Sequence, residues 1–133
     1  MVLLATAHIR YDGPARRDIT LKSNPTHILS PNNWTMVNQG RNAKPGSDAW
    51  KKYVQWYKGL LWERYKADPQ PFLDILESDY VVLCCYCTSV DTCHRRLAIE
   101  ALEWMGDQHG IEVVWVGEIN GRLPVLEPAM IGY

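Results

Sequence analysis

Two apolar segments on either side of one amphipathic helix constrain the fold of this chain most strongly. Tyr80–Cys87 and Ile111–Val116 are apolar along nearly their whole length, which is typical of strands covered on both faces. Between them, apolar residues recur at three- and four-residue spacing up to His109, and Gly110 is well suited to end the helix. Strand, helix and strand together predict a βαβ unit with parallel strands.

The remaining elements predict one α/β domain. Val2–Ile9 is almost entirely apolar and predicts another buried strand, and a chain of 133 residues normally folds as one domain. Capping residues and prolines predict helices that start at Ser30-Pro31, Ser47-Asp48 and Asp68-Pro69. We therefore expect a single three-layer domain, with a mostly parallel sheet whose three apolar strands are interior and with helices on both faces. Residues 117–133 are rich in turn-forming residues and predict a C-terminal extension or hairpin.

Composition limits the classes of function. A net charge of −1 argues against attraction of the whole surface to nucleic acid, although a local basic patch stays open. No apolar run is long enough to cross a membrane, and the N-terminus lacks the features of a signal peptide. Cysteines that crowd into one segment, instead of spreading along the chain, favour a reducing compartment. We expect a cytoplasmic protein, or one in the host cytoplasm if a phage encodes it, without a membrane partner.

The loop between Cys87 and the following helix is the predicted site. Ligands of parallel sheets bind beyond the carboxyl ends of the strands, and a helix N-terminus attracts anions. A cysteine in this first turn, Cys93, would have a lowered pKa and act as nucleophile or redox thiol. His94 would be the acid/base group or position Cys93, Arg95 would bind a phosphate or carboxylate, and Asp91 would cap the helix or orient a donor. Helical spacing also allows Cys93 and His94 to face the core as buried, inert residues, and both alternatives stay open.

Spacing argues against two other kinds of site. A phosphatase-type loop needs an arginine six residues after its cysteine, and counting from Cys87 that position is Cys93. A zinc site could use Cys85, Cys87, Cys93 and His94, but adjacent Cys93 and His94 are poorly placed to converge on one ion. We therefore expect no tightly bound stoichiometric zinc and no other cofactor.

The run from Leu83 to Cys85, followed by Cys93-His94-Arg95, resembles the signature of the YeaO-like bacterial and phage proteins, domain of unknown function 488. Similarity to phage-type members extends upstream through three segments, residues 17–22, 31–37 and the helix that carries Tyr53, Tyr57 and Tyr65. The resemblance implies a compact α/β fold without a settled activity. By position Cys85, Cys93, His94 and Arg95 match the motif. Cys87 stands where an acidic residue is common in the family, and Asp91 is the candidate substitute.

Basic and aromatic residues elsewhere add candidate ligand contacts. Arg16, Arg17 and Lys22 follow the first strand, where they would lie at the same edge of the sheet as the Cys-His-Arg turn, and Trp34 could stack on a base. We expect a small anionic, nucleotide-like substrate at the Cys-His-Arg helix start, with Cys85 and Cys87 among its contacts, and a thiol-dependent hydrolase or transferase activity. The alternative is an accessory protein that binds nucleic acid through these basic and aromatic residues. A monomer and a homodimer both stay open.

Overall fold

A computed structural model describes residues 1–87 and 93–119 of the chain. The described part contains four strands: β1 (Val2–His8), β2 (Arg16–Asp18), β3 (Tyr80–Cys85) and β4 (Val113–Ile119). It also contains four helices: α1 (Trp34–Arg41), α2 (Asp48–Ala67), α3 (Gln70–Leu76) and α4 (His94–His109). These elements confirm the α/β class predicted from the sequence. The part of the predicted C-terminal extension beyond Ile119 lies outside the described residues.

The described strands form one sheet in the order β2-β3-β1-β4, and every pair of neighbours is parallel. The prediction of parallel β3 and β4 is confirmed, and β1 lies between them. The expectation that β4 is interior is wrong within the described residues, because β4 pairs there with β1 alone. An apolar run cannot distinguish an interior strand from an edge strand whose faces are both partly covered. Most of β4 is indeed half-buried, whereas five of the six residues of β3 are buried.

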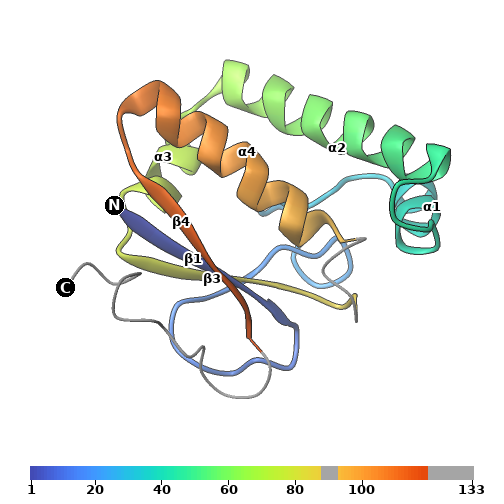
Figure 1. Cartoon of the computed structure of the whole chain (residues 1–133), viewed down its shortest axis with the longest axis horizontal. Helices are drawn as coiled ribbons and strands as arrows, with labels where there is room; N and C mark the ends of the chain where they lie inside the picture. Colours follow the sequence, from blue (N-terminus) through green and yellow to red (C-terminus); the bar gives the residue numbers. More distant parts are fainter. Residues whose placement is uncertain (88–92, 120–133) are drawn as a thin grey trace.

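All four described helices lie on the same side of the sheet (Figure 1). Leu4 and Leu83 point to this side and join a core cluster with buried residues of α2, α3 and α4, and Met36 of α1 packs against it. A second, smaller cluster lies on the opposite face of the sheet and contains no helix residue within the described ranges. Its strand residues include Ala5, Ala7 and Cys84, and the loop residue Tyr11 packs against them. The expected helices on both faces are therefore not found there. Small side chains such as Ala5 and Ala7 present less apolar area to be covered than leucines do.

Two helix ends follow the predicted capping residues, and the start of α1 does not. The Ser47 hydroxyl accepts a hydrogen bond from the Trp50 amide at 3.2 Å, and Gly110 ends α4 with a φ of 67°, both as predicted. α1 begins later than expected because Asn33 is its N-cap, whereas the Ser30 hydroxyl donates to the Asn24 carbonyl at 2.6 Å. Ser30 is thus used to fix the preceding loop.

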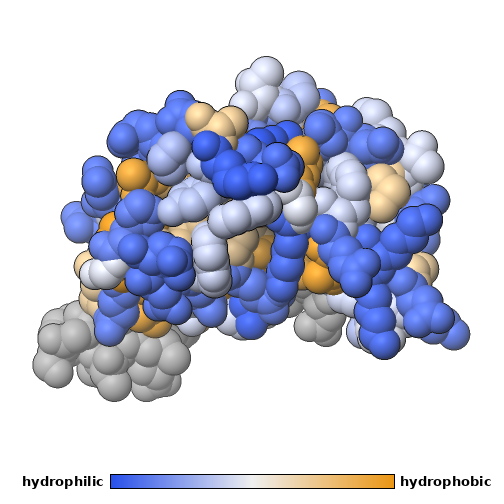
Figure 2. Space-filling model, turned by 90° about the horizontal axis from the view of Figure 1, so that it is seen from above, coloured by the Kyte–Doolittle hydropathy of each residue, from blue (hydrophilic) through white to orange (hydrophobic). Residues whose placement is uncertain are grey.

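None of the described helices combines the length and the apolarity that a membrane crossing requires. Seen from above the helices, the surface is mostly hydrophilic, and hydrophobic residues appear only in small separate areas (Figure 2). The apolar stripes of the helices are therefore largely buried inside the fold, where α4 packs on the sheet, α2 packs on α4 and α1 packs on α2.

The close contact between α4 and β4 depends on a glycine. A Cβ added at Gly106 would lie 2.6 Å from the Ile111 carbonyl oxygen and 2.6 Å from a Val113 methyl group. We expect Gly106→Ala to lower the free energy of unfolding by about 1–3 kcal/mol, as measured by denaturant unfolding. Gly59→Ala is the matched control, because nothing lies within 4 Å of its added Cβ and helix propensity should raise stability by about 0.5–1 kcal/mol. Equal effects of the two substitutions would contradict this account of the contact.

Candidate functional site

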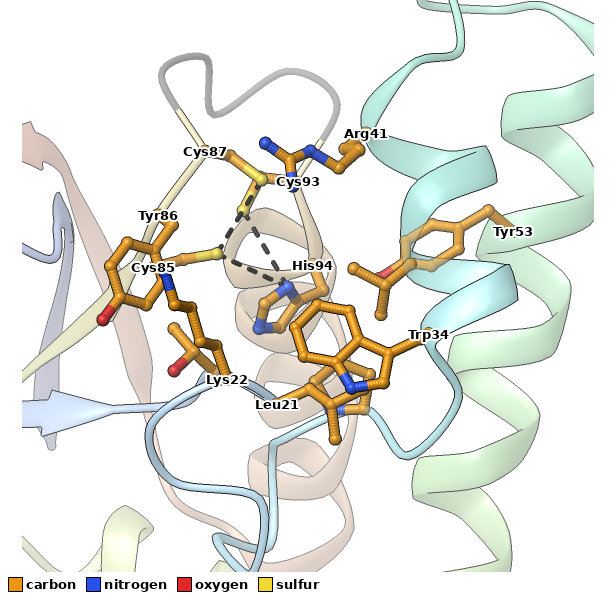
Figure 3. A pocket seen from close by; sticks show the side chains of 13 residues that line it. Leu21, Lys22, Trp34, Arg41, Tyr53, Cys85, Tyr86, Cys87, Cys93 and His94 are labelled. Carbon is orange, nitrogen blue, oxygen red and sulfur yellow. Dashed lines mark hydrogen bonds between the residues drawn. The ribbon is translucent and has the colours of Figure 1, made fainter.

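A cavity of about 280 Å³ opens beyond the carboxyl ends of β2 and β3, where sequence analysis placed the site. The loop after β2, the end of β3, the start of α4, and helices α1 and α2 all contribute to its wall (Figure 3). The described lining residues are Thr20, Leu21, Lys22, Pro31, Trp34, Val37, Arg41, Tyr53, Cys85, Tyr86, Cys87, Cys93 and His94. The cavity thus brings together four residues predicted to contact the ligand and two predicted to be catalytic. The first four are Lys22, Trp34, Cys85 and Cys87, and the other two are Cys93 and His94.

Aromatic and basic side chains line the outer part of the cavity. Trp34 is 49% exposed, and the Lys22 ammonium lies 5.0 Å from the centre of the Tyr86 ring. Arg41 also lines the cavity and was missed by sequence analysis. The sequence does contain a signal for it, because Trp34, Val37 and Arg41 are spaced by three and four residues and therefore share one face of α1.

Asp18 fixes the loop that carries Lys22. Its carboxylate accepts hydrogen bonds from the Thr20 amide at 2.9 Å, from the Thr20 hydroxyl at 2.7 Å and from the Ser23 hydroxyl. Burial disfavours the charged form of Asp18, but these hydrogen bonds outweigh burial and lower the pKa of the carboxyl group. The ionised Asp18 holds a tight turn, so the cavity wall on this side is preorganised.

Three sulfur atoms and one imidazole nitrogen gather at the bottom of the cavity (Figure 3). The Cys85 Sγ lies 3.8 Å from the Cys87 Sγ and 3.7 Å from the His94 Nδ1, and the Cys93 Sγ lies 3.9 Å from that same nitrogen. Ligand atoms of Cys85, Cys93 and His94 all lie within 4.8 Å of one another. We call Cys85, Cys87, Cys93 and His94 the thiol–imidazole cluster.

The sequence-based argument against zinc, that adjacent Cys93 and His94 are poorly placed to converge on one ion, is wrong, because their side chains do converge. Cys93 is the N-cap of α4 and has an extended backbone, with φ −130° and ψ 143°. Its side chain is therefore not restricted to helical spacing from His94, and both side chains reach the same place. Asp91, the predicted cap of this helix, lies outside the described residues.

His94 is held in one orientation. Its Nε2 lies 2.6 Å from the Ile19 carbonyl oxygen, which can only accept, so Nε2 carries the proton. The imidazole and the Tyr57 ring pack in a T-shaped arrangement, with ring centres 5.5 Å apart. Burial lowers the pKa of His94, which keeps the imidazole neutral. The unprotonated Nδ1 therefore presents its lone pair to the sulfur atoms.

The thiols of the cluster differ in acidity. Hydrogen bonds with Cys87 and Cys93 lower the pKa of Cys85 well below its ordinary value. Burial raises the pKa of Cys93 well above its ordinary value, and Cys93 is only 1% exposed. The expected lowered pKa of Cys93 is thus wrong, because burial outweighs the effect of the helix N-terminus. Cys85 is the thiol whose thiolate form is favoured.

Arg95 does not line the cavity, contrary to its predicted role as the anion-binding residue. Its side chain is fully buried and forms a two-pronged ion pair with Glu118, at 3.1 Å from Nε and 2.6 Å from Nη2. The remaining Nη1 donates to the Cys87 carbonyl at 2.9 Å and to the Cys93 Sγ at 3.2 Å. Arg95 is therefore used inside the fold, where it ties α4 to β4 and supports the cluster.

The predicted basic loop is only partly at the site. Arg16 donates to the carbonyls of Tyr11 and Ile9, at 2.9 and 3.1 Å, and Arg17 lines a separate hollow with His27. Of the three basic residues after β1, only Lys22 lines the cavity. β2 carries Arg16 and Arg17 alongside the middle of β3, which places them short of the strand ends.

Comparison of the chain with protein-family models, with curated proteins and with solved structures found no match. The resemblance to the YeaO-like family therefore stays a prediction, and the functional argument depends on the cavity itself.

Proposed function

We propose that this protein binds a small anionic ligand with a planar ring, such as a nucleotide, in the cavity between α1 and the ends of β2 and β3. One observation carries the proposal: an exposed tryptophan and two cations, Trp34, Lys22 and Arg41, line the same cavity. A planar ring can stack on the indole while a phosphate or carboxylate pairs with a cation. At about 280 Å³ the cavity is near the lower end of the usual range for small-ligand pockets, which favours a compact ligand.

The charges are available for a ligand. Among the described residues, no carboxylate lies within ion-pair distance of Lys22 or Arg41. Arg41 carries a planar guanidinium that can bind a phosphate through two parallel hydrogen bonds. The Lys22 ammonium already lies over the Tyr86 ring, which holds this cation at the cavity.

The distribution of basic residues favours a small ligand over a nucleic acid chain. A phosphate backbone would need cations in a continuous track, and Arg16 and Arg17 are separated from Trp34 by their place on β2. Arg95 adds nothing to such a track because it is buried against Glu118.

Nucleotide binding can be measured by calorimetry with nucleoside monophosphates and with inorganic phosphate. We expect Trp34→Ala to weaken nucleotide binding by about 1–3 kcal/mol and to leave phosphate binding unchanged, because only the base stacks. Arg41→Ala should weaken binding of both probes, since it removes a charge-assisted contact worth about 1.5–3 kcal/mol.

Trp104→Ala and Arg10→Ala are the matched controls, because both residues are exposed and neither lines the cavity. Both controls should bind the probes like the unchanged protein. A nucleotide affinity that Trp34→Ala leaves intact, or an unchanged protein that binds neither probe, would refute the proposed function.

A further inference from the structure

Three separations within the thiol–imidazole cluster match those of a tetrahedral metal site. Zinc binds sulfur at about 2.3 Å and imidazole nitrogen at about 2.0–2.1 Å, which separates two sulfur ligands by about 3.8 Å and a sulfur from a nitrogen by about 3.6 Å. The Cys85 and Cys87 sulfurs are 3.8 Å apart, and the His94 Nδ1 lies 3.7 and 3.9 Å from the Cys85 and Cys93 sulfurs. These three separations lie within a few tenths of an ångström of the zinc values.

The surroundings also match those of a metal site. The His94 Nε2–H donates to the Ile19 carbonyl, which directs the lone pair of Nδ1 into the cluster. Arg95 donates from Nη1 to the Cys93 Sγ at 3.2 Å, a contact that stabilises a thiolate. Metal ligands commonly have such partners, because these partners fix the tautomer of a histidine and the charge of a thiolate.

We infer that Cys85, Cys93 and His94 bind a zinc ion, with Cys87 as the fourth ligand at the cavity wall. The first three residues are buried and their ligand atoms lie within 4.8 Å of one another, so they form the fixed part of the site. Cys87 is half-buried, and its sulfur lies beside that of Cys85. A tetrahedral set of thiolates and imidazole favours zinc over magnesium or calcium, which prefer oxygen ligands.

Zinc uptake by this cluster has a defined proton balance. Each cysteine that arrives as a thiol loses its proton to solvent when its sulfur binds the ion, and His94 binds as neutral imidazole without losing one. No oxidation or reduction takes place. The Cys85 thiolate would be bound to the ion, so this cysteine would not be free to act as a nucleophile.

Elemental analysis and cobalt substitution test the site on the full chain. Protein purified without chelator in a reducing buffer should contain about one zinc per chain. After removal of zinc, Co²⁺ should produce thiolate-to-cobalt charge-transfer absorption and the visible bands of tetrahedral cobalt. Cys85→Ser should weaken cobalt binding by more than the roughly 10–100-fold that loss of an outer partner costs. Cys87→Ser should retain cobalt with reduced charge-transfer absorption, because one thiolate fewer is bound.

Cys84→Ala is the matched control, because Cys84 is a buried neighbour of Cys85 that faces the opposite side of the sheet. It should bind cobalt like the unchanged protein. Because a serine variant can fail to fold, the unchanged protein supplies a second measurement. Zinc should slow alkylation of Cys85, Cys87 and Cys93 in mass spectrometry, and a chelator should restore the rate.

The site is refuted if the reduced, folded protein takes up neither zinc nor cobalt, or if zinc leaves alkylation of these cysteines unchanged. A similar loss of cobalt binding in Cys84→Ala and Cys85→Ser would refute it as well. The result is separable from the proposed function, because nucleotide binding can be measured in the presence of chelator and depends on Trp34 and Arg41.

Discussion

Glu118→Ala should lower the free energy of unfolding by about 3–5 kcal/mol, as measured by denaturant unfolding at neutral pH. Removal of the carboxylate leaves the guanidinium of Arg95, which is fully buried, without its counter-charge. The two hydrogen bonds from Nε and Nη2 have no replacement among the described side chains. An uncompensated buried charge is among the most costly defects that a single substitution can introduce.

A second ion pair provides the control for this prediction. Lys58 and Glu100 lie 2.8 Å apart, but both side chains are substantially exposed. Glu100→Ala should therefore change stability by no more than about 1 kcal/mol. The double substitution Arg95→Met with Glu118→Leu should recover much of the loss, because it removes both charges together. A similar small loss in Glu118→Ala and Glu100→Ala would contradict the view that Arg95 depends on Glu118.

Tyr57→Ala should lower the free energy of unfolding by about 3–5 kcal/mol, as expected for loss of a large buried aromatic side chain. Tyr57 is fully buried between α2 and the start of α4, and its ring packs against His94. Tyr57→Phe should cost about 1–3 kcal/mol, since the Leu29 carbonyl loses the hydroxyl that donates to it at 2.6 Å. Thermal or denaturant unfolding of both variants measures the two contributions separately.

Tyr65→Phe is the control for the hydroxyl group. Its hydroxyl lies 2.6 Å from the His109 Nε2 in an exposed place, where water can replace the lost partner. The expected change is therefore smaller than that of Tyr57→Phe. A Tyr57→Phe variant as stable as the unchanged protein would show that the Leu29 carbonyl finds another donor.

The class of fold could be predicted because strand and helix periodicities were both clear. Tyr80–Cys87, the following helix and Ile111–Val116 predicted parallel strands, and the structure has them. Lateral order in the sheet could not be predicted, because apolar alternation reports which faces of a strand are covered and not which strands are its neighbours. The same limit explains why the sequence did not reveal that the described helices gather on one face.

The place of the site followed from topology, but the roles of its residues did not. Cys87 and Cys93, the described residues on either side of the predicted site loop, both line a cavity. The roles of the residues depend on the local backbone conformation and on partners that are distant in the sequence. Cys93 and His94 converge only because Cys93 has an extended backbone at the N-cap, and Arg95 is unavailable because Glu118, far along the chain, pairs with it. Neither fact has a signal in the motif itself.

Among the described residues β4 pairs only with β1, and this edge position links the sheet to the bottom of the cavity. Edge strands are held by fewer hydrogen bonds than interior strands and open more readily in local unfolding. Glu118 lies on this strand, its partner Arg95 donates to Cys93, and Cys93 lies beside His94. Transient separation of β4 from β1 would therefore release the guanidinium and loosen the sulfur atoms, although no residue of the cluster is on β4. Hydrogen exchange of the β4 amides would in this way report on how firmly the bottom of the cavity is held.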